Sequence, residues 1–121
     1  MRILTIITLF VLATVFISSC EKKIFKAPVV DPNTPVSFTS EIQPMFTAKC
    51  AVSGCHSGAV SPNLSDGKAY SALIDGGLVD TLNATTSVLY VKITTNMPPS
   101  KLPASDISKV LFWIKQGAKD K

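Results

Sequence analysis

The hydrophobic positions divide this chain into three parts. Residues 3–17 form a near-continuous apolar run of 15 residues, and residues 21–37 contain three prolines and few large apolar side chains. From Phe38 onward, apolar residues recur at spacings of three and four, the period of a helix buried on one side, and no alternating strand pattern competes. The pattern predicts one small all-α domain over residues 38–121, built from about four short helices.

The first helix of this domain is predicted over residues 41–49, directly before Cys50. Ser40 and Gln43 match a capping box, and Pro44 lies in the first turn, where its missing N–H costs no intrahelical hydrogen bond. The residues expected on one face of this helix are Ile42, Met45, Phe46 and Lys49.

Three further helices are predicted after the cysteine-containing loop. Their start and stop signals are Asp66 and Gly76-Gly77 for the second, Ser87 for the third over residues 88–93, and Ala104 or Ser105 and Gly117 for the last. The last helix is the most periodic, with an apolar stripe of Ile107, Val110, Leu111 and Ile114.

The N-terminal apolar run has the features of an export signal. Arg2 supplies a positive charge, and the 15 apolar residues that follow are too few to span a bilayer comfortably. The run ends in Ile17-Ser18-Ser19-Cys20, which resembles a bacterial lipobox. We therefore expect residues 1–19 to be a lipoprotein signal peptide and Cys20 to be lipidated, with an uncleaved short anchor as the alternative.

Residues 20–37 are expected to form a lipid-anchored, extended tether. Pro28, Pro32 and Pro35 favour a weakly structured, polyproline-like chain. At about 3.1 Å per residue, residues 21–37 would hold the domain at most ~50 Å from a membrane. The expected location is therefore the cell envelope, with the domain exported and facing the periplasm or the surface.

The charge of the mature chain does not indicate nucleic-acid binding, and we expect none. Once Arg2 has been removed, 11 lysines stand against 8 acidic residues, a net charge of +3. Nucleic-acid binding would require the basic residues to gather in a stripe, whereas these lysines are scattered along the chain.

The chemistry of the domain is concentrated in one heptapeptide, which reads C-A-V-S-G-C-H. It contains Cys50, Cys55 and His56, the only histidine of the chain. Two thiols followed directly by an imidazole are what a protein needs to attach haem covalently and ligate its iron from the proximal side. The usual spacing is C-x-x-C-H, so the four intervening residues must bulge away from the porphyrin edge, and Gly54 allows that bulge.

Two other readings of the heptapeptide remain open at this point. An exported protein commonly pairs its cysteines, so Cys50 and Cys55 could form a local disulfide that leaves His56 without a role. A zinc site is a weaker alternative, because the set lacks a fourth protein ligand unless a carboxylate supplies it.

The domain resembles a small class I c-type cytochrome over residues 38–121. An aromatic residue, Phe46, stands four positions before the first cysteine, Pro62-Asn63-Leu64 follows the histidine, and the terminal helix carries Trp113. More narrowly, it is similar to single-haem cytochrome c lipoproteins and domains of Bacteroidota type, which often have the widened cysteine spacing. The resemblance implies a cytochrome c-like fold wrapped around one covalent haem c.

The same resemblance implies roles for several residues. The Pro62 carbonyl would accept the Nδ1 proton of His56, so that Nε2 binds iron, while Leu64 and Trp113 would contact the haem. Trp113 would also dock the terminal helix against the first helix through Phe46. Because the mature chain has no arginine, the haem propionates would have few protein partners, among which Lys68, Tyr70 and Trp113 are candidates.

Met97 is the candidate distal ligand of the haem iron. Only Met45 and Met97 remain after signal cleavage, and Met45 lies on the helix that delivers the attachment site. Met97 stands 41 residues after His56 and is followed by two prolines that hold the chain extended. Ligation by His56 and Met97 fills both positions on the iron and raises its potential.

The function expected from this set is electron transfer, not enzymatic catalysis. The chain would be a membrane-tethered monohaem cytochrome that carries single electrons between respiratory or envelope redox proteins. One alternative is a haem-based gas-binding sensor, if Met97 does not ligate the iron. A second is a non-haem lipoprotein stapled by a disulfide between Cys50 and Cys55.

Overall fold

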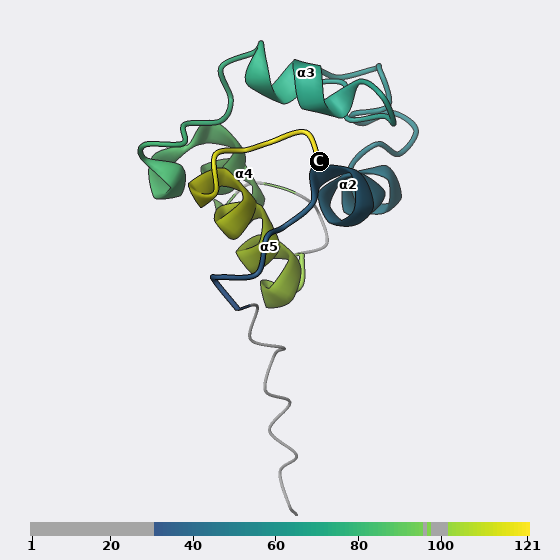
Figure 1. Cartoon of the computed structure of the whole chain (residues 1–121). Helices are drawn as coiled ribbons and strands as arrows, with labels where there is room; N and C mark the ends of the chain where they lie inside the picture. Colours follow the sequence, from purple (N-terminus) through teal and green to yellow (C-terminus); the bar gives the residue numbers. More distant parts are fainter. Residues whose placement is uncertain (1–30, 96, 98–101) are drawn as a thin grey trace, which may run out of the picture.

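The computed structural model describes residues 31–95, 97 and 102–121. These residues form a small all-α fold with no strand in the described part of the chain, as the sequence predicts. The four helices are α2 (Gln43–Lys49), α3 (Ala69–Ile74), α4 (Val88–Thr95) and α5 (Ala104–Lys115), with a π-helical turn η1 (Phe38–Ile42) and a 3₁₀ turn η2 (Ala84–Thr86). In Figure 1, α3 lies across the top of the molecule, above α2 and α4.

The first helical segment begins one turn earlier than predicted. The Ser37 side chain caps η1 by accepting a hydrogen bond from the Ser40 amide at 3.1 Å, and the Glu41 carboxylate accepts one from the Ser37 amide at 3.0 Å. The predicted capping box of Ser40 and Gln43 is therefore wrong. Gln43 is instead buried, and its side-chain amide donates to the Leu64 carbonyl at 3.2 Å, which joins α2 to the loop after the cysteines.

Two other predicted cap side chains make different contacts, although α4 begins at Val88 as predicted. No side chain caps α3, so Asp66 does not have the predicted role, and the Ser65 carbonyl accepts the amides of Lys68 and Ala69 instead. The Ser87 hydroxyl accepts from the Asp80 amide and donates to the Leu78 carbonyl, so it ties a loop to the start of α4. Loop contacts thus occupy the Ser87 hydroxyl, which the local sequence assigned to a cap.

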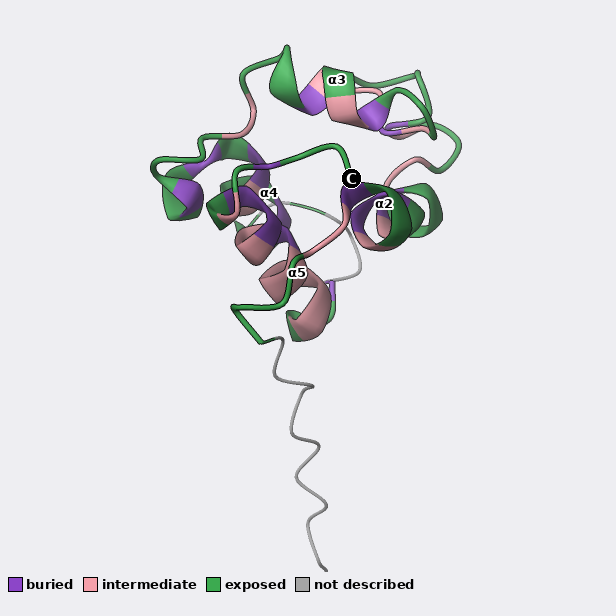
Figure 2. Cartoon of the chain, in the orientation of Figure 1, coloured by how far each residue is buried: buried purple, intermediate pink, exposed green. Residues whose placement is uncertain are grey.

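The core lies where α5 meets η1 and α4. Val110, Trp113 and Ile114 of α5 are all at most 1 % exposed, and the buried positions in Figure 2 face the space between the helices. Phe38 connects α5 to α2, since its ring centroid lies 5.1 Å from that of Trp113 and 6.3 Å from that of Phe46. The expected docking of the terminal helix is therefore mediated by Phe38, which stands between the two predicted partners.

Candidate functional site

An apolar cavity of about 260 Å³ opens between α2, α3, α4 and the loop that follows the cysteines. Its wall combines residues from all four segments, so no single segment forms it. The lining residues are Phe46, Cys50, His56, Ser61, Pro62, Leu64, Leu73, Leu78, Val88, Leu89, Lys92, Ile93 and Met97. Only a few polar groups are present in this wall, a composition typical of a site for an apolar ligand with a small number of anchoring atoms.

Helix α2 delivers Cys50 to this cavity. The amides of Cys50 and Ala51 both donate to the Phe46 carbonyl at 2.8 Å, which ends the helix and turns the chain into the loop. The His56 amide then donates back to the Cys50 carbonyl at 3.1 Å, so the two ends of the heptapeptide lie together. Cys50 and Cys55 are free, half-buried thiols.

Burial raises the pKa of the Cys50 thiol, and the neighbouring Cys55 adds a smaller rise. A thiol in an apolar wall is harder to ionise because its thiolate loses hydration. Cys50 is therefore held protonated at neutral pH and faces the cavity as an uncharged group.

Gly54 has the left-handed backbone conformation that the bulge between the cysteines requires. Its φ is +79°, and a Cβ atom added to it would meet no atom within 4 Å. Glycine is therefore favoured at this position by the backbone conformation and not by a lack of space for a side chain.

Gly54→Ala is expected to destabilise the domain by about 1–2 kcal/mol, the typical cost of a left-handed conformation for a residue with a Cβ. Gly54→Asn is the matched control and should cost less, because asparagine adopts this conformation more readily. Chemical denaturation of both variants measures the difference. An alanine variant as stable as the wild type would show that the loop does not need this conformation.

The imidazole of His56 is fixed by two backbone carbonyls. Its Nδ1 lies 2.9 Å from the Pro62 oxygen, the contact that the resemblance implies, and 3.2 Å from the Val60 oxygen. Both oxygens can only accept hydrogen bonds, so the ring proton lies on Nδ1 and the lone pair lies on Nε2. With only 9 % of the residue exposed, this lone pair is directed into the protein interior.

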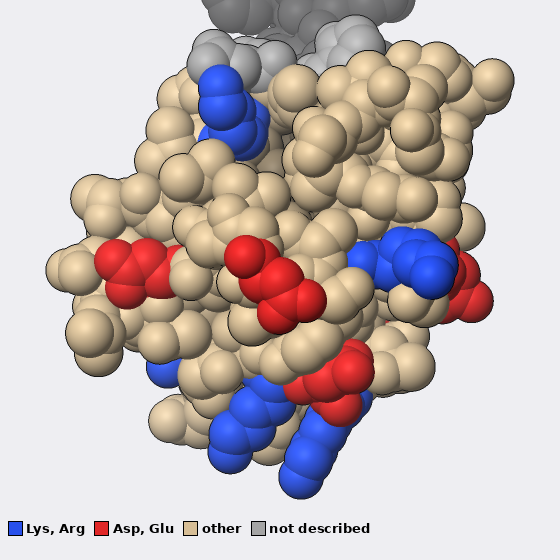
Figure 3. Space-filling model, turned by 90° about the horizontal axis from the view of Figure 1, so that it is seen from above, with Lys and Arg blue, Asp and Glu red and all other residues tan. Residues whose placement is uncertain are grey.

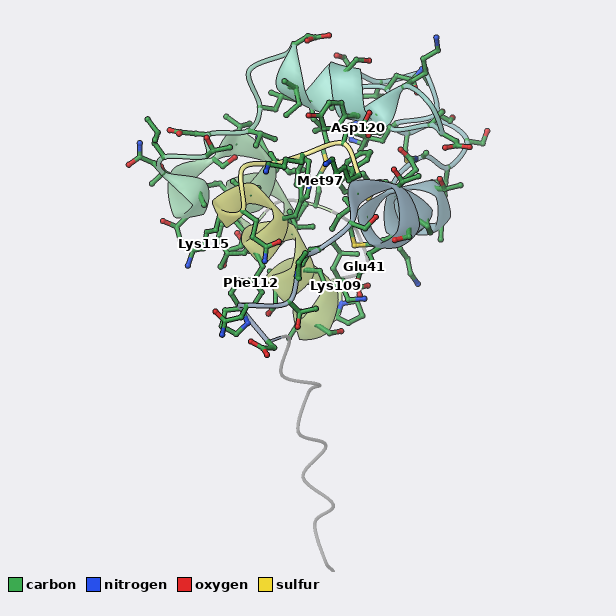
Figure 4. The ribbon with its side chains drawn as sticks, viewed as in Figure 1. Glu41, Met97, Lys109, Phe112, Lys115 and Asp120 are labelled. Carbon is green, nitrogen blue, oxygen red and sulfur yellow. The ribbon has the colours of Figure 1, made fainter. Side chains whose placement is uncertain are left out.

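The sulfur of Met97 lies 3.4 Å from His56 Nε2, although the two residues are 41 positions apart. The Met97 amide donates to the Lys92 carbonyl at 2.9 Å, which ties this residue to the last turn of α4. Figure 4 shows Met97 between α2 and α4. A thioether has no proton to donate, so two lone-pair donors face each other across the cavity.

Such a pair is suited to a metal ion, since each atom offers a lone pair and neither can donate a hydrogen bond to the other. Typical bonds of about 2.0 Å to imidazole nitrogen and 2.3 Å to sulfur would span about 4.3 Å in a straight line. For one ion to lie on the straight line between the two atoms, the sulfur would have to move back by roughly 1 Å. Met97 is unbranched and 43 % exposed, so rotation of its side chain can provide this shift.

The remaining predicted haem contacts divide into two groups. Pro62 and Leu64 line the cavity, and Leu64 is 5 % exposed. Trp113 does not line it. Its indole N–H donates to the Lys119 carbonyl at 2.9 Å, and the Tyr70 hydroxyl donates to the Ala118 carbonyl at 3.0 Å. These two candidates for propionate contacts are thus engaged with the C-terminal segment.

Sequence reasoning missed most of the apolar wall. Leu73 and Leu78 come from α3 and the loop after it, and Leu89 and Ile93 come from α4. The spacing of four between Leu89 and Ile93 was a usable signal, because it places both on one side of a helix. The contact between the Val60 carbonyl and His56 Nδ1 could not be predicted, because every residue has a backbone carbonyl.

No family model, curated protein or solved structure matches this chain. Within the described residues, no three or more His, Cys, Asp or Glu side chains gather where they could hold a metal ion. The predicted signal peptide, Cys20 and the prolines after Met97 lie outside the described residues.

Proposed function

We propose that this chain is a membrane-tethered monohaem c-type cytochrome that carries single electrons. The observation that supports this best is the opposition of His56 Nε2 and Met97 Sδ, 3.4 Å apart, in an apolar cavity that also contains Cys50. Soft sulfur and imidazole ligands suit a haem iron that changes charge by one electron without changing its ligands. This supports an electron carrier over an enzyme.

Four residues would hold the cofactor. Cys50 and Cys55 would bind haem covalently, and His56 and Met97 would ligate its iron. When bound, haem supplies a centre that accepts and releases one electron. The Pro62 and Val60 carbonyls keep the proton on Nδ1 so that Nε2 stays available as a ligand, while Leu64, Leu89 and Ile93 exclude water from the cavity.

A gas-binding sensor is the second candidate function. The observation that favours it is the position of Met97, which is 43 % exposed and too close to Nε2 for an ion to lie on the line between them unless the sulfur moves. If Met97 stayed off the iron, one coordination position would be open to a diatomic gas. The disulfide-stapled lipoprotein has less support, because both thiols are free.

The proposed partners are redox proteins of the cell envelope, reached from a lipid anchor on Cys20. Helices in the described part of the chain are all too short or too polar to cross a bilayer. Acidic and basic side chains are interspersed on the face shown in Figure 3. A mixed surface of this kind favours brief contacts with protein partners over binding to a polyanion.

The test is the pyridine haemochrome spectrum of protein expressed with a c-type maturation system. The wild type should show a haem c spectrum with the haem mass retained on a peptide that contains Cys50 and Cys55. Cys50→Ala/Cys55→Ala should lose covalent haem completely. Cys20→Ala is the matched control, because it removes the third cysteine and should lose membrane anchoring while keeping haem. A wild-type peptide with a disulfide and no haem mass would contradict the proposal.

A further inference from the structure

The side chain of Gln116 joins the end of α5 to residues 32–36, part of the predicted tether. Its Oε1 accepts from the Val36 amide at 2.8 Å, and its Nε2 donates to the carbonyls of Thr34 at 3.0 Å and Pro32 at 3.3 Å. One side chain thus binds three backbone groups that lie more than 79 positions away in the chain. In Figure 1 the first described residues run beside α5.

We propose that Gln116 is a clamp that docks residues 32–36 onto α5, so that the tether leaves the domain at a defined place. The meaning of this clamp for a membrane-bound protein depends on the function proposed above, whereas the docking itself does not. A hollow of about 340 Å³ lies between the docked segment and the end of α5, lined by both. Its lining residues are Pro32, Asn33, Pro35, Val36, Trp113, Gln116, Lys119 and Lys121.

The chemistry of this contact requires a carboxamide. A carboxylate can accept from the Val36 amide but cannot donate to two carbonyls, and an ammonium can donate but cannot accept. Gln116 also stands where α5 ends, since Gly117 follows with a left-handed φ of +95° and turns the chain away. The side chain therefore reaches the tether from a fixed point on the helix.

A second set of bonds holds the docked segment on its C-terminal side. The Ser37 hydroxyl donates to the Lys121 carbonyl at 2.6 Å, and the Thr39 amide donates to the same oxygen at 3.3 Å. Pro32 and Pro35 lower the entropy lost on docking, because proline has few backbone conformations in the undocked chain. Val36 also packs against the core, so the clamp acts together with apolar burial.

Docking shortens the reach of the tether that was expected from the sequence. The span between Cys20 and the docked segment becomes residues 21–31, which reaches at most ~34 Å at about 3.1 Å per residue instead of ~50 Å. The hollow and the apolar cavity share no lining residue. The docked segment therefore lies away from the cavity that would hold the haem, while it keeps the domain closer to the membrane.

Hydrogen exchange of the full-length lipidated protein in bilayer nanodiscs tests this proposal. In the wild type, the Val36 amide should exchange at least about tenfold more slowly than in an unstructured peptide of the same sequence. Gln116→Leu removes all three bonds at similar size and should abolish that protection. Lys115→Ala is the matched control, since this exposed neighbour on α5 makes none of these contacts and should leave exchange unchanged.

Peptides that contain Trp113, measured in the same samples, report whether a variant is folded. If Gln116→Leu unfolds, Gln116→Glu is the replacement variant. Glutamate keeps an acceptor for the Val36 amide but cannot donate to the Thr34 and Pro32 carbonyls, so it should reduce the protection of the Val36 amide only in part. Wild-type exchange at the unstructured rate, or unchanged Val36 protection in a folded Gln116 variant, would overturn the clamp. Absence of a haem spectrum would instead contradict the proposed function and would leave the exchange result standing.

Discussion

In the proposed cytochrome, alanine in place of Met97 is expected to open the haem iron to external ligands. The variant removes the sulfur that lies 3.4 Å from His56 Nε2 in the wall of the cavity. The oxidised wild type should show the weak long-wavelength band of a sulfur-to-ferric-haem bond, and Met97→Ala should lose it. The reduction potential should fall by on the order of 0.1 V, within the ~0.8 V range that axial ligands set.

Carbon monoxide titration measures the same change independently. Met97→Ala should bind it readily in the reduced state, whereas the wild type should not. Met45→Ala is the matched control, because this thioether packs against the core and does not line the cavity. If the wild type already binds carbon monoxide quickly and has a high-spin ferric spectrum, the sensor function replaces the electron carrier.

Replacing Phe38 by alanine is expected to destabilise the domain by about 3–5 kcal/mol, the typical cost of truncating a buried aromatic side chain. Phe38 is 3 % exposed, and its ring lies 5.3 Å from that of Tyr70 and 5.1 Å from that of Trp113. Its loss would leave a cavity at the junction of η1, α3 and α5. This cost is a large share of the ~5–15 kcal/mol by which such domains are stable.

Phe112→Ala is the matched control for this experiment. Phe112 lies on α5, which contributes to the core, but its side chain is only half-buried, and Figure 4 shows it on the outer side of the helix. Its truncation should cost clearly less in urea or guanidinium denaturation, because less apolar area returns to water. Equal losses of stability for the two variants would place the main aromatic packing elsewhere.

The elements with local signals could be predicted from the sequence. The most periodic segment became α5, which ends before Gly117 as expected, and α2 ends at Cys50 because the helix signal stops there. The spacing of the heptapeptide placed Cys50 and His56 together, and Gly54, which was expected to allow the bulge, has a left-handed conformation. Each of these features depends on residues within about two helical turns of one another.

Features that join distant segments were decided by tertiary structure. Gln43 and Ser87 show this clearly, because the local pattern assigns both to helix caps, whereas Gln43 donates to the Leu64 carbonyl and Ser87 contacts Asp80 and Leu78. A polar group that finds a partner in a neighbouring loop no longer serves its own helix, and sequence does not show which loop will be near.

What the sequence determined by itself is therefore the set of helices and the candidate site residues. The tertiary structure decided which of those residues meet. It brought Met97 to 3.4 Å from His56, turned Trp113 away from the cavity, inserted Phe38 between α2 and α5, and bound residues 32–36 to Gln116. The physical reason is that helical period and turn chemistry act over a few residues, whereas packing between remote segments depends on the shape of the whole core.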